Sequence, residues 1–318
     1  MWHLNYLTPE QEQEYLNLIF DKVQQRRDKI KQSQVKSYLS NEKLKEILLS
    51  RPKYLYEKKK IKEYKEKIFL SQYDKLMDAK RIKKENRTHE KNNLIEKYKS
   101  IYKVFDYSQI IVKDKTISYQ IANLIGEKTC IYCNRQYVFT VEENGGQITR
   151  PEFDHYLPKS YYPFFALSLY NLIPSCHICN SHCKGDEELP QNMHPYLTNE
   201  QDFFKFTYNI NGENPSSVQI KNKTKLSKNV QKFLDVFKIQ EIYNCHTDLE
   251  LTELYTFATK YSNTYLQGIL SEIESKLNLS QEEAYRILFG TELFEDKNNN
   301  RPLSKFKRDI LRELGVIK

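Results

Sequence analysis

The sequence lacks both a long apolar run and a leader of the secretory type. Hydrophobic residues make up 39% of the 318 residues, and no uninterrupted apolar stretch approaches the roughly 20 residues that a membrane-spanning helix needs. The opening residues, MWHLNYLTPEQEQEY, do not place basic residues before an apolar segment, as a secretory signal does. These absences predict a cytoplasmic protein with no membrane partner.

Two further patterns are missing. The sequence has no G-x-x-x-x-G-K-[ST] motif, which excludes ATP hydrolysis by a P-loop, so any ATP-driven step must come from another subunit. It also has no repeat at solenoid spacing and no low-complexity tract. A chain of this length is therefore expected to form one large or two modest domains with a hydrophobic core.

Positive charge is in excess, and one segment carries most of it. The net charge is +8, whereas residues 51–104 hold 18 lysines and arginines against 8 aspartates and glutamates, a surplus of 10. Such a basic segment suits a polyanion such as nucleic acid. The alternative is a solvated helical face in a chain that is rich in lysine throughout, and composition does not separate the two.

Local patterns predict an α+β, mostly helical fold with helices on both sides of a small β-containing centre. Helical periodicity runs from residue 9 to about 105 with breaks at Ser40 and Pro52, and from Lys53 onward it favours one long surface helix over a coiled coil. Asn-Gly-Gly at 144–146 and Asn-Gly at 211–212 predict two hairpins. We divide the chain into a basic helical region (1–125), a central unit (126–198) and a hairpin with further helices (199–318).

Four of the six cysteines form two C-x-x-C pairs. Cys130 and Cys133 are separated by 42 residues from Cys176 and Cys179, and each pair can direct two thiolates at one tetrahedral zinc ion. We therefore predict a structural Zn²⁺ site that joins the two ends of the central unit, in place of disulfides or a thioredoxin-like redox pair. Cys183 could substitute as a ligand, but we interpret it as a spare buried thiol.

The segment around the second pair contains Asp154-His155, then Asn171 within N-L-I-P-S-C, then Asn180 within C-N. Together with the two C-x-x-C pairs, this order resembles the HNH endonuclease family, whose ββα-metal unit places a strand, a loop, a second strand and a helix in that sequence. The likeness covers residues 128–196, about a fifth of the chain. The segment is also similar to the HNH subunit that accompanies an ATPase in Septu anti-phage systems, including those encoded with retrons.

The resemblance implies roles for five residues. His155 would be the general base, since an ordinary histidine is largely neutral at cytosolic pH. Asp154 and Asn180 would bind one Mg²⁺ or Mn²⁺ ion through oxygen. Asn171 would brace the loop and the catalytic histidine. Lys184 stands one place beyond the position where many family members carry a lysine, so its contact with phosphate is left open.

Each of these residues also has an ordinary structural explanation. A histidine on a strand is often a packed, hydrogen-bonded residue, and the aspartate beside it could simply hold the ring. Asn180 could cap a helix, and Asn171 could be a plain turn residue.

We expect a metal-dependent endonuclease that hydrolyses nucleic-acid phosphodiesters, DNA in preference to RNA, within an anti-phage complex that includes an ATPase partner. The resemblance implies products with 5′-phosphate and 3′-hydroxyl ends. One alternative is a zinc-stabilised module that binds nucleic acid or joins an assembly without catalysis. Another keeps the nuclease and changes its substrate to RNA, such as tRNA.

Overall fold

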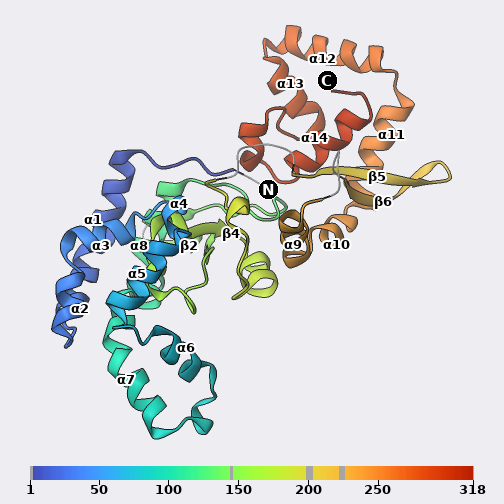
Figure 1. The fold of residues 1–318 in the computed structure, drawn as a ribbon. Coiled ribbons are helices and arrows are strands. Elements are labelled where there is room, and N and C mark those ends of the chain that lie inside the picture. Colours follow the sequence, from blue (N-terminus) through green and yellow to red (C-terminus); the bar gives the residue numbers. More distant parts are fainter. Residues whose placement is uncertain (1–2, 144–145, 198–202, 222–225, 318) are drawn as a thin grey trace.

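The computed structural model describes residues 3–143, 146–197, 203–221 and 226–317. In these ranges the chain is mostly helical and has three antiparallel sheets of two strands each, so the predicted α+β, mostly helical class is confirmed. Figure 1 shows the N-terminal and C-terminal helices on either side of the central strands. Within the described part of the chain, none of the helices combines the length and apolar character needed to cross a membrane.

The N-terminal region begins with a capped helix, α1 (Pro9–Asp28). The Thr8 side chain accepts a hydrogen bond from the Gln11 backbone N–H, the Gln11 side chain accepts one from the Thr8 N–H, and Pro9 takes the first helical position. The elements that follow are α2 (Ser33–Tyr38), α3 (Asn41–Leu48), α4 (Pro52–Leu55), α5 (Lys58–Ile68), α6 (Tyr73–Arg81), η1 (Lys84–Asn86), α7 (His89–Val104), η2 (Ser108–Val112) and α8 (Lys115–Ile125).

The prediction of one long surface helix from Lys53 onward is wrong. This segment forms α4, α5, α6 and α7, and α5 ends at Ile68. Leu70 and Ser71, which follow it, have positive φ angles of 48° and 58°, and a left-handed residue stops a right-handed helix. The helices α6 and α7 lie at one end of the molecule (Figure 1), where α7 packs against α1. The apolar residues spaced along the segment therefore belong to several short helices.

Two small sheets make up the centre. Strands β1 (Val141–Glu143) and β2 (Gly146–Thr149) pair antiparallel, as the first hairpin prediction requires, although Asn144 and Gly145 of its turn lie outside the described residues. Strands β3 (Glu152–His155) and β4 (Leu172–Ser175) pair antiparallel with His155 opposite Leu172. Around them lie the short helical segments η3 (Pro163–Phe165), η4 (Leu169–Asn171), η5 (Ile178–Lys184) and η6 (Gln191–Met193).

The C-terminal region begins with the second predicted hairpin. Strands β5 (Lys205–Asn211) and β6 (Asn214–Lys221) pair antiparallel, and Gly212 has the positive φ of 67° that suits the turn. The elements that follow are α9 (Lys228–Phe237), α10 (Ile239–Asn244), η7 (Thr247–Leu251), α11 (Thr252–Lys260), α12 (Asn263–Leu277), α13 (Gln281–Phe289), η8 (Glu295–Asn300) and α14 (Ser304–Glu313).

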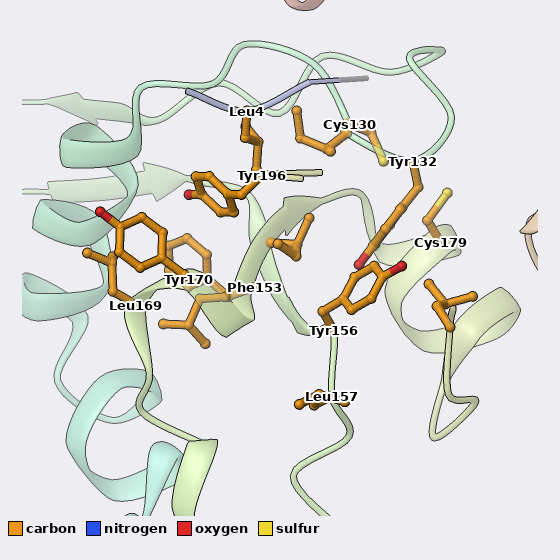
Figure 2. Packing of buried hydrophobic residues seen from close by; sticks show 14 of the residues in the cluster. Leu4, Cys130, Tyr132, Phe153, Tyr156, Leu157, Leu169, Tyr170, Cys179 and Tyr196 are labelled. Atoms are coloured by element: carbon orange, nitrogen blue, oxygen red, sulfur yellow. The ribbon is translucent and has the colours of Figure 1, made fainter. Parts of the chain in front are cut away.

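Both flanking regions are connected to the centre by buried hydrogen bonds. From α1, the Tyr15 hydroxyl donates to the Leu167 carbonyl over 2.7 Å, and Ser168 donates to the carbonyl of Ile47 in α3 over 2.6 Å. From the other side, the Tyr243 hydroxyl donates to the Cys133 carbonyl over 2.7 Å. Figure 2 shows aromatic core residues beside Cys130 and Cys179. The loop between β3 and β4 is therefore tied to the N-terminal helices.

A buried histidine gives this core a testable dependence on pH. His194 lies fully inside with its ring 4.3 Å from that of Tyr156, and burial lowers the pKa of His194 to about 3. The unfolded chain binds this proton below about pH 6.5, whereas the folded chain does not until about pH 3. The contribution to stability is therefore complete above pH 6.5 and is lost as the pH falls.

We expect the His194→Asn variant to lose less stability on acidification than the unmutated protein. Between about pH 5.5 and 4.5, where the unfolded histidine is almost fully protonated and the folded one is not, the free energy of unfolding should fall less steeply by about 1.4 kcal/mol per pH unit, the value for one proton. Glu127, whose pKa is raised to about 7 by burial, acts in the opposite direction but is common to both proteins. Urea unfolding at several pH values measures the difference, and equal slopes would contradict it.

Candidate metal centre and active site

The four cysteines of the two C-x-x-C pairs meet in the structure. The sulfur atoms of Cys130, Cys133, Cys176 and Cys179 all lie within 4.8 Å of one another, and all four residues are buried. Thiolates bound 2.3 Å from a tetrahedral zinc lie about 3.8 Å apart, so the cluster fits a metal ion such as zinc. Cys183 is half-buried and does not belong to this cluster. The predicted convergence of these four cysteines is confirmed, and the cluster could bind a metal such as zinc.

Tyr132 connects the cysteine cluster to the strand that carries Asp154. Its backbone lies between Cys130 and Cys133, its ring stacks on Phe237 at 4.2 Å, and its hydroxyl donates to Asp154 Oδ2 over 2.5 Å. Figure 2 shows the ring of Tyr132 between the cysteines and Tyr156. The position of the Asp154 carboxylate therefore depends on a side chain that lies between two cysteines of the cluster.

Lys184 holds the other oxygen of Asp154. Its ammonium lies 3.2 Å from Asp154 Oδ1 and donates to the backbone carbonyl of His155 over 2.8 Å, and both side chains are almost completely buried. Burial raises the pKa of the Asp154 carboxyl, while Lys184 and Tyr132 act in the opposite direction. This geometry favours a positioning role for Lys184 over contact with phosphate.

Removing the Tyr132 hydroxyl should loosen Asp154 without disturbing the cysteines. We expect Tyr132→Phe to lower the free energy of unfolding by about 1.5–3 kcal/mol, because a buried hydrogen bond to a charged group is lost. Zinc content should not change. Urea unfolding provides the measurement, and Tyr137→Phe is a matched control because that ring is 47% exposed. Equal stabilities of the two variants would mean that the Tyr132–Asp154 bond contributes nothing.

His155 is held in one tautomer. Its Nε2 lies 3.0 Å from the Ala166 carbonyl oxygen, and because a carbonyl oxygen only accepts, Nε2 carries the proton and Nδ1 does not. The ring also lies edge-on to Tyr107 at 4.5 Å. Burial, assisted by Lys159, lowers the pKa of His155 to about 3. The imidazole is therefore neutral at physiological pH, with one nitrogen free to accept a proton.

Asn171 connects the two ends of the loop between β3 and β4. Its Oδ1 accepts from the Leu157 N–H over 2.7 Å, and its Nδ2 donates to the carbonyls of Leu157 and Phe165, each at 3.1 Å. Phe165 directly precedes Ala166, whose carbonyl orients His155. The fully buried Asn171 amide thus holds the Phe165 carbonyl, one residue before the Ala166 carbonyl that His155 contacts.

A pocket of about 490 Å³ brings several of these groups to one place. Asp154, His155 and Asn180 line it, as the sequence predicted for residues of one site, whereas Lys184 and Asn171 lie outside its lining. Its polar and charged wall also includes Glu152, Asp186, Arg150, Lys159 and Ser181. Carboxylate and amide oxygens suit a hard cation such as Mg²⁺, and the two basic side chains suit a phosphate.

Glu152 is a candidate that the sequence analysis missed. Its Oε2 accepts a hydrogen bond from Asn180 Nδ2 over 2.7 Å, and its Oε1 lies 2.7 Å from His177 Nδ1. The nitrogen end of the Asn180 amide is thus committed to Glu152, and the oxygen end is the one that can serve a cation. The available signal was spacing, since Glu152 lies two residues before Asp154 on one strand and therefore shares its face.

Comparison with known proteins gives one short local similarity. A segment of 55 residues, 16% of the chain, is 42% identical to Protein ea31 of Escherichia phage lambda. The match spans 18% of that phage protein, well under two thirds of its length. No protein-family model matches the chain, and no solved structure matches it.

Proposed function

We propose that this chain is a metal-dependent endonuclease of the HNH type, which hydrolyses phosphodiester bonds in nucleic acid. One observation carries the proposal: a neutral histidine with a free Nδ1 lines the same pocket as a fixed carboxylate and an oriented amide. Hydrolysis of a phosphodiester needs a base for the attacking water and positive charge for the phosphate, and this pocket offers residues suited to both.

His155 is the proposed base. Its Nδ1 takes the proton of the attacking water, while the Ala166 carbonyl accepts a hydrogen bond from Nε2 and stabilises the imidazolium that results. Asn171 holds the neighbouring Phe165 carbonyl. A pKa of about 3 makes a weak base, but an anionic phosphate in the pocket favours the charged ring and so raises this value. Positioning by Ala166 contributes further because it removes the need to orient the ring.

Asp154 and Asn180 are the proposed ligands of a Mg²⁺ or Mn²⁺ ion, and Glu152, which lines the same pocket, orients the Asn180 amide. Such an ion, when bound, supplies positive charge that offsets the charge developing on the leaving oxygen. Lys184 and Tyr132 hold Asp154 in place. Arg150 and Lys159 on the pocket wall neutralise the phosphate. The cysteine cluster is proposed to bind a structural Zn²⁺.

The biological setting is proposed from the sequence resemblance. A place in an anti-phage complex with an ATPase subunit is consistent with a chain that has no P-loop motif, because the ATP-driven step would then belong to the partner. DNA is the proposed substrate, with RNA as the alternative, since the pocket chemistry requires only a phosphodiester.

A cleavage assay with two substrates, plasmid DNA and total RNA, tests the nuclease proposal. We expect the purified, zinc-loaded protein to cut plasmid DNA in Mg²⁺ or Mn²⁺, to act more slowly on total RNA, and to be inactive in EDTA. End-labelling should find 5′-phosphates. Faster cleavage of RNA than of plasmid DNA would make RNA, and not DNA, the substrate. Tight binding of nucleic acid with no cleavage in either metal would favour the non-catalytic alternative.

A further inference from the structure

A second pocket, of about 420 Å³, lies beside the candidate active site and is lined by cations. It forms where α1, α7 and η2 meet, and four of its lining residues are basic: Lys22, Arg26, Lys29 and Lys103. The others are Gln25, Ser100, Gln109 and Ile110, so none of the described lining residues is acidic. We call it the basic pocket.

Acidic neighbours fix two of these cations. The Lys22 ammonium lies 2.7 Å from Asp114 Oδ2. Arg26 donates to the Lys103 carbonyl over 3.0 Å and lies 4.0 Å from Asp106 Oδ2.

Lys29 and Lys103 form no ion pair with any described residue. Four cations against two carboxylates leave a local surplus of two positive charges. Such a surplus around a concave surface attracts phosphate groups.

One short segment separates the basic pocket from the candidate active site. Gln109 and Ile110 of η2 line the basic pocket, while Tyr107 and Val112 at its two ends line the pocket that contains His155. The Tyr107 ring contacts the imidazole of His155. A chain of phosphates that reaches the active site can therefore continue over this segment.

Much of the basic segment 51–104 is less suited to binding phosphate groups next to the candidate active site. Several of its lysines are paired within the chain: Lys60 with Glu46, Lys62 with Glu66 and Lys99 with Glu96. Its helix α6 also lies away from the central strands (Figure 1). Of the cations in the segment, Lys103 near the end of α7 is the one that lines the basic pocket. Two of the four cations of the basic pocket, Lys22 and Arg26, come instead from α1, and Lys29 directly follows that helix as its C-cap residue. The charge balance of the sequence did not single out this part of the chain.

We propose that the basic pocket binds phosphate groups of the nucleic-acid strand at positions away from the bond that is cut. The proposal rests on the proposed nuclease function for its choice of ligand. Lys29 and Lys103 make the main contribution because no carboxylate neutralises them, and Arg26 presents its guanidinium at the same wall.

Binding measured without cleavage tests this proposal. We expect the double variant Lys29→Gln, Lys103→Gln to bind a labelled oligonucleotide in EDTA about tenfold more weakly than the unmutated protein. Its slope of log Kd against log salt should be smaller by about 1.4–1.8, the value for two lost phosphate contacts. The control is Lys62→Gln, Lys99→Gln, which removes the same charge from exposed, ion-paired positions. Equal affinities of the two double variants would overturn the proposal.

Competition with ATP at matched ionic strength distinguishes two possible ligands of the basic pocket, a nucleic-acid strand and a free nucleotide. Displacement of the oligonucleotide only at high ATP concentration supports strand binding, whereas ATP binding that is tighter than oligonucleotide binding and is lost in Lys29→Gln, Lys103→Gln overturns it. Failure of the nuclease proposal would look different from failure of the basic-pocket proposal. In the first case the oligonucleotide would bind through Lys29 and Lys103, but Mg²⁺ would produce no cleavage. If cleavage occurs, the double variant should raise KM and leave kcat unchanged.

Discussion

Replacing His155 by alanine is expected to slow phosphodiester hydrolysis by a factor of about 10²–10⁴, the range for loss of a positioned general base. The side chain brings an unprotonated Nδ1 to the pocket wall, and no other histidine is among the described residues of that wall. Initial rates on plasmid DNA in Mg²⁺ measure the effect.

The matched control for this variant is His246→Ala. His246 is paired with Glu250 at 2.7 Å, in the C-terminal region, and its removal should leave the rate within a factor of two or so of the unmutated protein. Zinc content and thermal unfolding show whether His155→Ala is folded. A folded His155→Ala protein that retains full activity would remove His155 from the mechanism.

Replacing Cys176 by serine is expected to unfold the central unit. Structural zinc sites contribute about 10–16 kcal/mol of apparent binding free energy in small zinc-binding peptides, whereas whole domains are stable by only about 5–15 kcal/mol. A site that loses one thiolate should bind zinc far more weakly and lower the melting temperature by more than 10 °C or so. Zinc analysis and thermal unfolding provide the two measurements, and an excess of chelator should reproduce the change.

Two other cysteines offer controls of the same chemistry. Cys183 is half-buried and Cys245 is exposed, and serine at either position should leave one zinc per chain and an unchanged melting temperature. Because Tyr132 reaches Asp154 from between two cysteines of the cluster, metal removal should also abolish cleavage that added Mg²⁺ cannot restore. Full zinc content in Cys176→Ser would show that the four cysteines do not form one site.

The sequence was sufficient for features that depend on neighbouring residues. The cap of α1 at Thr8 and that of α13 at Ser280 were readable because their partners lie three residues away. The cysteine cluster could be predicted because two C-x-x-C pairs in a chain of this kind indicate a shared metal site more often than disulfides or a redox pair. Gly212 likewise identified the second hairpin, since its turn needs a positive φ.

Features set by tertiary contacts could not be read in the same way. The hydrogen bond from Tyr132 to Asp154 spans 22 residues and that from Asn180 to Glu152 spans 28. No local sequence pattern therefore predicts either hydrogen bond. The break after Ile68 was also hidden, because Leu70 and Ser71 take up a conformation that their residue types do not favour. The basic pocket likewise forms only when α1 and α7 meet.

The hydrogen bonds from Tyr15 to Leu167 and from Ser168 to Ile47 limit how far the protein can be truncated from its amino-terminal side. They anchor the residues that directly follow Ala166, whose carbonyl sets the tautomer of His155. An excised fragment that kept every motif residue but omitted the first two helical turns of α1 would lose one of these anchors. A minimal version of the proposed nuclease must therefore include the amino-terminal helices, because they anchor the loop that holds His155 in the candidate active site.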